Sequence, residues 1–275
     1  MPWRLCVELN NGFRQIKIES STSDSPQAPS TTHTFSLILE AIELKRFKNA
    51  IFLLSSLSSA ELSQLDFQGW NLLHRAVESG DAGLVEAILS HMDRDAIGIR
   101  NEQVHSALEM AIERNMADIC RLIVPLMCRD QLARLDANGW SALHLACDSS
   151  KKESLEIVSL LAEAMTPADL STLSKHDERS ALQWCMTTGG EIGTANARTL
   201  IAHMRPEDLI RPHSDSATYL EIAVRDGYIG IAEALREHML PHDFNEIAET
   251  LQPEAINDNW RLMLTQKTAC KGVEA

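Results

Sequence analysis

A twelve-residue pattern that occurs twice in the chain places the strongest constraint on its fold. Residues 66–77 read D-F-Q-G-W-N-L-L-H-R-A-V, and residues 136–147 read D-A-N-G-W-S-A-L-H-L-A-C. Each copy joins a turn sequence that ends in glycine to a hydroxyl or amide residue suited to capping a helix. Both copies therefore predict the same unit, a tight turn that leads into a short helix.

The pattern recurs in weaker form along most of the chain. Ala76 and Ala146 lie 70 residues apart, and the segment S-A-L-E-M-A between them ends at Ala111. With the other copies, these residues form an anchor row of small side chains: Ala41, Ala76, Ala111, Ala146, Cys185 and Ala223. The spacings are 35, 35, 35, 39 and 38 residues. Such a period indicates a stacked repeat protein, in which each unit packs on its neighbours.

A second row keeps register with the anchors and predicts where the second helix of each unit ends. Its members are Leu57, Met92, Met127, Met165, Met204 and Met239. The longer spacings place extra residues within 148–154 and 187–196, and the glycine-rich sequence of 187–196 predicts a loop. After this row, proline and acidic residues in segments such as 166–170 and 205–209 predict a short helical turn in place of a full β-hairpin finger.

The anchor segments N-L-L-H-R-A and S-A-L-H-L-A resemble the T-P-L-H-x-A signature of ankyrin repeats, whose period is about 33 residues. The resemblance implies an all-α, ankyrin-like helical solenoid of about six helix–turn–helix repeats. It also implies a non-catalytic protein–protein interaction module. The short helical connections resemble those of ankyrin-like repeats in bacterial effector proteins. A secreted effector or adaptor, whose repeats dock a host protein while a terminal segment recruits another factor, is therefore the alternative.

The ends of the chain have a different composition from the repeats. Residues 1–19 alternate apolar and polar side chains around Asn11-Gly12, which predicts a β-hairpin. Residues 20–34 are rich in Ser, Thr and Pro, which predicts a linker. The repeats are expected over 35–240. Residues 241–275 have apolar residues at helical spacing but no further anchor, which predicts a helical cap.

Charge and cysteine usage narrow the classes of partner. The net charge of −14 and the pI near 5.1 disfavour nucleic acid and anionic membrane surfaces and suit a partner protein with a basic segment. The competing interpretation is that the acidity only keeps the protein in solution. The six cysteines contain no C-x-x-C pair, which favours reduced structural thiols and a cytoplasmic location. No signal peptide or membrane-spanning segment is expected, and we expect a monomer, with delivery into a host cell if it is an effector.

Two rows of side chains are candidates for partner binding on a concave face. The position six before the anchor, which follows the turn glycine, carries residues common in interface hot spots: Trp70, His105, Trp140 and Arg179. The position two after the anchor is acidic in the first half of the stack: Glu78, Glu113 and Asp148. The competing interpretations are that each tryptophan only fills space against the neighbouring turn and that the acids form a solvated face.

No catalytic, metal or cofactor site is predicted, and no phosphate-binding or zinc-protease motif occurs in the sequence. His144 and Cys147 share one helix, but both are expected to be structural, with His144 capping a helix or bonding a loop. A row formed by His91, His203 and His238 is expected to interact with helix C-termini. An enzyme that uses the 187–196 segment with Cys185 or His176 is the least favoured class.

Overall fold

The computed structural model describes residues 3–10, 13–20, 31–102, 105–212 and 217–251. Strands β1 (Trp3–Asn10) and β2 (Phe13–Ser20) pair antiparallel, with Leu5 opposite Ile18. Helix α1 (Thr31–Glu43) begins inside the segment 20–34 that the composition predicts as linker. The reason for the earlier start is that Thr34 is buried in the first turns of α1. The rest of the predicted linker, residues 21–30, lies outside the described residues.

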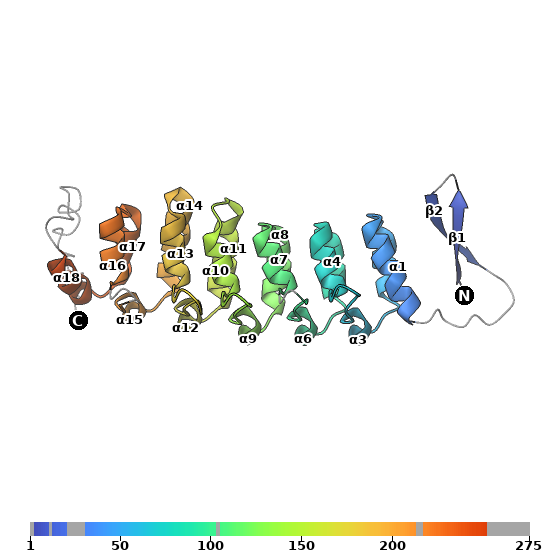
Figure 1. Cartoon of the computed structure of the whole chain (residues 1–275), viewed down its shortest axis with the longest axis horizontal. Helices are drawn as coiled ribbons and strands as arrows, with labels where there is room; N and C mark the ends of the chain where they lie inside the picture. The colour runs from blue at the N-terminus through green and yellow to red at the C-terminus, as the bar shows by residue number, and fades with distance from the viewer. Residues whose placement is uncertain (1–2, 11–12, 21–30, 103–104, 213–216, 252–275) are drawn as a thin grey trace, which may run out of the picture.

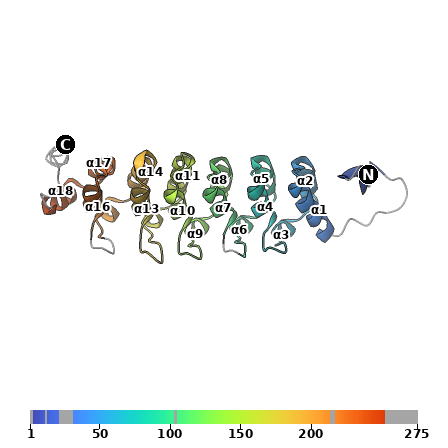
Figure 2. The ribbon, with the colours of Figure 1, turned by 45° about the horizontal axis from the view of Figure 1, so that its top comes forward.

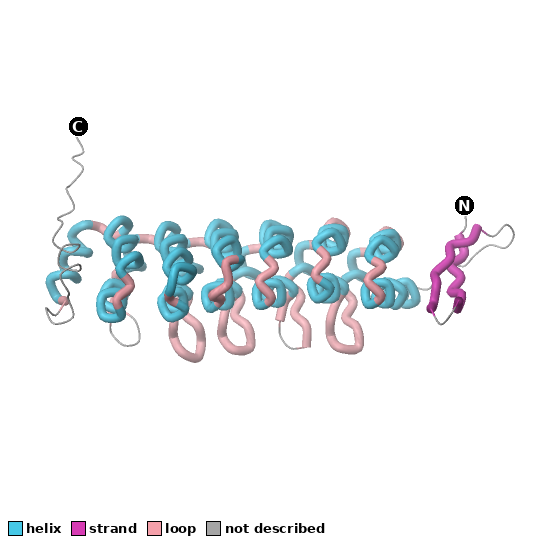
Figure 3. Tube along the Cα trace, turned by 90° about the horizontal axis from the view of Figure 1, so that it is seen from above, coloured by secondary structure: helices cyan, strands magenta, loops and turns pink. Residues whose placement is uncertain are grey.

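The described chain from α1 onward forms an elongated row of helix pairs (Figure 1). The first helices of the pairs are α1, α4 (Leu72–Ser79), α7 (Ala107–Glu113), α10 (Ala142–Asp148), α13 (Ala181–Thr188) and α16 (Tyr219–Asp226). The second helices are α2 (Phe47–Leu54), α5 (Ala82–Leu89), α8 (Ala117–Ile123, extended by the 3-10 turn η1, Val124–Leu126), α11 (Glu153–Ala164), α14 (Gly190–His203) and α17 (Ile229–His238). Figure 3 shows the two layers that these helices form.

Short helices connect one pair to the next, as the proline and acidic segments predict. They are α3 (Ser59–Leu62), α6 (Arg94–Ile97), α9 (Arg129–Leu132), α12 (Pro167–Leu170) and α15 (Pro206–Leu209). Between the short helices and the first helices that follow them, the described chain runs through projecting loops, here called fingers (Figure 2). The fingers discussed below are residues 63–71, 133–141, 171–180 and, in its described parts, 98–102 with 105–106. Two of them carry an isolated β-bridge, so the connection combines a helical turn with a minimal hairpin.

Local sequence determines where the paired helices begin and end. Asn71, Ser106, Ser141, Ser180 and Thr218 each cap a first helix through a reciprocal capping box. In most pairs the turn between the two helices contains a residue with positive φ, which glycine or asparagine adopts at low cost. These turn residues are Lys45, Gly80, Asn115, Gly189 and Gly227.

The anchor row lies at the centre of the continuous core, as the repeat pattern predicts. Ala41, Ala76, Ala111, Cys185 and Ala223 have no exposed surface, and Ala146 is 1% exposed. The methionine row is also buried, and Met165, Met204 and Met239 occupy the C-caps of α11, α14 and α17. After the last pair, α18 (Pro241–Thr250) packs against α16 and α17 and buries Phe244. Residues 252–275 of the predicted cap lie outside the described part.

The prediction of a loop over residues 187–196 is wrong. Helix α13 continues to Thr188, and α14 begins at Gly190, so only Gly189 separates them. The extra residues instead lengthen the second helices, because α14 has 14 residues and α11 has 12, whereas α5 has 8. Glycine here allows close packing rather than a loop. A Cβ atom on Gly193 would lie 2.4 Å from the backbone oxygen of Cys185 in the facing helix.

Replacing Gly193 with alanine is therefore expected to lower the free energy of unfolding by about 2 kcal/mol, because the added methyl forces α13 and α14 apart. Urea titration followed by circular dichroism measures the change. Gly83→Ala on α5 is the matched control, since the nearest atom to its new Cβ lies 3.4 Å away. Alanine is the better helix former, so this control should gain up to about 1 kcal/mol. Equal losses in the two variants would contradict the close approach at Gly193.

Candidate interaction surface

Hydrogen bonds at the base of each finger hold the predicted partner-binding position in place. In the first finger the Asp66 N–H donates to the Trp70 carbonyl at 2.8 Å, and the Trp70 N–H donates to Asp66 Oδ1 at 3.0 Å. The pairs with this arrangement are Asp66–Trp70, Asn101–His105, Asp136–Trp140 and Ser174–Arg179. The backbone at Trp70, His105, Trp140 and Arg179 is therefore fixed in the same way in successive repeats.

Two buried histidines tie fingers to the preceding repeat. His144 Nε2 lies 3.1 Å from the Arg179 carbonyl, and Nδ1 lies 2.7 Å from Ser141 Oγ. A carbonyl only accepts, so Nε2 carries the proton and Nδ1 accepts. His74 makes the same contact with the His105 carbonyl at 3.1 Å. The prediction that His144 caps a helix or bonds a loop is confirmed.

Burial makes both histidines hard to protonate. Desolvation lowers the pKa of His74 to about 4, although the His105 carbonyl and Asp66 act in the opposite direction. Desolvation also lowers the pKa of His144. The second histidine row lies at helix ends: the ring nitrogens of His203 and His238 lie 2.9 Å from the carbonyl four residues earlier in the same helix, and that of His91, just beyond α5, lies 2.9 Å from the Ala87 carbonyl. That contact agrees with the predicted interaction at helix C-termini.

Trp70 is half-buried and packs on its own repeat. The Arg75 guanidinium carbon lies 4.7 Å from the centre of the Trp70 ring, and the Arg75 Nε donates to Asp66 Oδ2 at 2.7 Å. Burial alone would raise the pKa of Asp66, but its hydrogen bonds from the Trp70 and Gln68 backbone and from Arg75 hold it below the ordinary value. Trp70 therefore stabilises its finger and also presents an exposed edge.

Trp140 belongs to an aromatic cluster that the sequence analysis did not predict. Its ring lies 4.5 Å from the ring of Trp184, at an interplanar angle of 50°. The exposed Arg179 side chain lies above Trp184 at 5.4 Å from the ring centre. Trp184 directly precedes the anchor Cys185, whereas Leu145 directly precedes the anchor Ala146 of the repeat before it. This change from leucine to tryptophan was the signal in the sequence from which the cluster could have been predicted. The cluster joins two of the predicted binding residues across adjacent repeats.

The acidic row lies at the exposed ends of α4, α7 and α10. Glu78 is 3.2 Å from Arg75 and 3.9 Å from Arg114. Glu113 lies 3.8 Å from His105, and Asp148 is exposed. The row is thus negative, but nearby basic residues reduce its charge in the first repeats. Because these pairs are solvent-exposed, each stabilises the fold by at most about 1 kcal/mol.

The described cysteines on helices have the environment of core residues. Desolvation raises the pKa of Cys120 to about 12. Burial also raises the pKa of Cys147, whose neighbour is Cys185 in the next first helix. A thiol with a raised pKa is a poor nucleophile at neutral pH. Within the described ranges, no group of three or more His, Cys, Asp or Glu side chains is arranged to hold a metal ion.

Comparisons with known proteins agree with this architecture. A family model described as ankyrin repeats, in three copies, matches residues 73–174. The crystal structure of the ankyrin repeat protein EF0377 superposes with a TM-score of 0.58 and 18% identity, over 74% of this chain and 98% of that chain. The ankyrin repeat domain of Bcl-3, a member of the IkappaB protein family, superposes with a TM-score of 0.57 and 17% identity, over 73% of this chain and 84% of that chain. Among curated proteins, no sequence matches the chain.

Of the helices in the described ranges, none has the length and apolar character that a bilayer crossing requires. Ankyrin repeats generally act as non-enzymatic scaffolds for protein–protein interaction. The three matched copies, the buried anchor row and the structural neighbours together identify residues 73–174 as ankyrin repeats and show that the described stack has the ankyrin-repeat fold.

Proposed function

We propose that this chain is a non-catalytic protein-binding module that uses the side of the stack formed by the fingers and the first helices. This finger face carries Trp70, His105, Trp140 and Arg179 together with Glu78, Glu113 and Asp148. Our proposal takes it to be the concave face of a monomer with six repeats, preceded by the N-terminal hairpin. The partner is a protein with a basic segment. An adaptor or a delivered effector would use the same face, with a terminal segment recruiting a second factor.

The observation that carries the proposal is the repetition of one arrangement in successive repeats. Finger backbones are held in the same way, and the residues that they present are tryptophan, histidine and arginine beside exposed carboxylates. Tryptophan and arginine contribute strongly when they are desolvated in an interface. Exposed carboxylates add charge complementarity to a basic segment and speed its association. A face built for solubility alone would not need aromatic residues at its edge.

Neutralising the acidic row tests the proposal. The variant E78Q/E113Q/D148N and the unchanged protein are each used as bait in a lysate. The variant should capture about one tenth or less of the amount of partner that the unchanged protein captures, as measured by quantitative mass spectrometry. The matched variant E86Q/D118N/E163Q removes the same charge from exposed positions on the second helices. This control should capture as much as the unchanged protein. Equal loss in both variants would show that only net charge matters, and no loss in the first would place binding elsewhere.

A further inference from the structure

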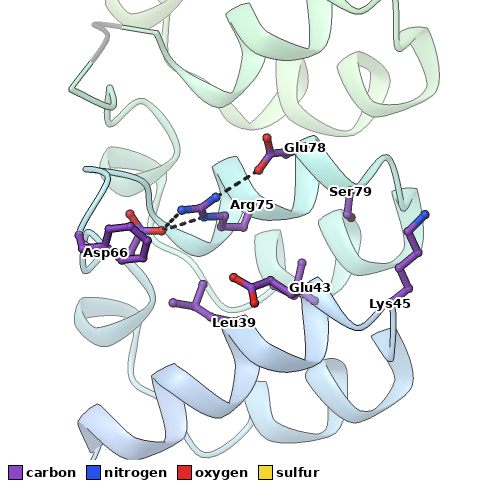
Figure 4. A pocket seen from close by; sticks show the side chains of 9 residues that line it. Leu39, Glu43, Lys45, Asp66, Arg75, Glu78 and Ser79 are labelled. Atoms are coloured by element: carbon purple, nitrogen blue, oxygen red, sulfur yellow. Dashed lines mark hydrogen bonds and ion pairs between the residues drawn. The ribbon is translucent and has the colours of Figure 1, made fainter. Parts of the chain in front are cut away.

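A small cavity at the N-terminal end of the finger face lies between α1, α4 and the first finger. Its volume is about 190 Å³. Leu39 of α1 (Figure 4) and Ile42 of the same helix supply apolar surface, and Phe67 borders the cavity from the finger. Ligand pockets for drug-sized molecules start at about 300 Å³, so this cavity suits a single side chain rather than a cofactor.

Phe67 is the most unusual residue around this cavity. It is 87% exposed, the largest value among the exposed large apolar residues of the described chain. Its counterpart in the finger before α10 is Ala137, so neither the turn nor the capping residue requires an aromatic side chain. Leu65 in the same finger is 50% exposed. Exposed aromatic surface beside an apolar cavity is typical of an interaction site.

The charged residues at the cavity indicate the chemistry of what binds there. Glu43 of α1 extends into the space between α1 and α4, whereas the Glu78 carboxylate lies on the side of α4 away from α1, beside Arg75 (Figure 4). Arg75 also lines the cavity, but its guanidinium is committed to Asp66 and, at 3.2 Å, to Glu78. Lys45 stands at the far end of the cavity, beyond Glu43 (Figure 4). A cation of a partner would therefore be favoured beside Glu43, whose carboxylate is not the one that Arg75 binds.

We propose that this cavity binds one apolar side chain of a partner polypeptide, covered by Phe67, while an adjacent lysine or arginine of the same polypeptide pairs with Glu43. This inference deepens the proposed function and rests on it, because it names the anchor that a basic segment would insert. The apolar contact supplies the affinity by removing the exposed surface of Phe67 from water. The Glu43 carboxylate selects the neighbouring residue by charge.

Selection from a display library of random twelve-residue peptides tests the site without knowledge of the natural partner. Peptides enriched on the whole protein should share an apolar residue directly beside lysine or arginine. Phe67→Ala should weaken binding of a selected peptide at least about tenfold. Phe52→Ala is the matched control, because Phe52 is also exposed, at 65%, but lies on the second helix α2. Binding by this control should be unchanged, and neither substitution disturbs the core.

The charge requirement has its own readout. Glu43→Gln should remove the preference for lysine or arginine at the neighbouring position and leave the apolar preference intact, whereas Glu86→Gln on α5 should alter neither. Enriched peptides without a shared apolar residue, or equal binding by Phe67→Ala, would overturn the proposal. Sedimentation velocity provides a further test: a dimer of the unchanged protein that Phe67→Ala abolishes would make a second copy the occupant and would also overturn it.

The two proposals can fail separately. If E78Q/E113Q/D148N loses the captured partner while Phe67→Ala keeps it, the finger face binds and the cavity is not its anchor. If the triple variant keeps the partner, the acidic row does not bind it and the proposed function fails, whereas the peptide selection still decides whether the cavity binds an apolar side chain.

Discussion

Replacing Ala111 with leucine is expected to lower the free energy of unfolding by about 3 kcal/mol, at the upper end of what overpacking a core costs. Ala111 has no exposed surface, and its helix α7 packs against α4, α8 and α10. A larger side chain at this point has no free space and must displace at least one of these helices. The repeat cannot shift outward to make room for the added volume, because each repeat is confined by its two neighbours.

Urea unfolding of the full chain, followed by circular dichroism, measures this loss. Ala137→Leu is the control, since Ala137 lies exposed in a finger and the same added volume meets solvent. Its effect should stay within about 0.5 kcal/mol. If the two leucine variants unfold at the same urea concentration, the anchor row is not a tight helix–helix contact, and the repeat assignment built on it is wrong.

Acidification from pH 6.5 to pH 4 is expected to cost about 3 kcal/mol of stability through His74 alone. The unfolded chain binds a proton at this residue with the ordinary pKa of 6.5, whereas burial lowers the pKa in the folded state to about 4. The folded protein is therefore at its most stable above pH 6.5, loses stability through this window, and has lost the whole contribution below pH 4. His144 shifts in the same direction and adds to the loss.

The acid-sensitive window distinguishes these histidines from the carboxylates. The hydrogen bond from Arg129, assisted by those from Thr166, lowers the pKa of Asp169 to about 2, so the stability that it contributes is lost only below its ordinary value of 3.8. Urea midpoints measured from pH 7 to pH 4 should fall less steeply for His74→Gln than for the unchanged protein. His176→Gln changes an exposed finger histidine and should leave the slope unaltered. Equal slopes for all three proteins would contradict the buried, neutral state of His74.

The sequence predicts those features whose causes lie close together in the chain. Ser141 capping α10 and the left-handed Gly80 after α4 follow from local backbone preferences, and the anchor alanines follow from the period. The segment 187–196 was predicted incorrectly because glycine favours loops when only its neighbours are considered. At Gly193 the decisive neighbour is the backbone of Cys185 in the facing helix, which the helix–helix packing brings close.

The candidate site was only partly accessible from sequence for a related reason. Trp70 and Trp140 could be placed in register, but their packing on Arg75 and Trp184 depends on side-chain directions that the period does not determine. Phe67 was visible as a residue of a turn, yet its significance depends on the cavity between α1 and α4. The repeats can therefore be predicted from the sequence, whereas a surface that two repeats form together can be recognised only in the three-dimensional structure.

The two histidine ties have a mechanical consequence. Among the described residues, His74 is hydrogen-bonded to the His105 carbonyl and His144 to the Arg179 carbonyl, each in the finger of the following repeat. The contacts between neighbouring repeats, here called joints, therefore differ in elastic stiffness along the stack. Protonation of His74 and His144 on acidification loosens these two joints first, because each imidazole ring then has two donors and no acceptor. Acid should thus make the solenoid more compliant at two defined points before the helices themselves melt.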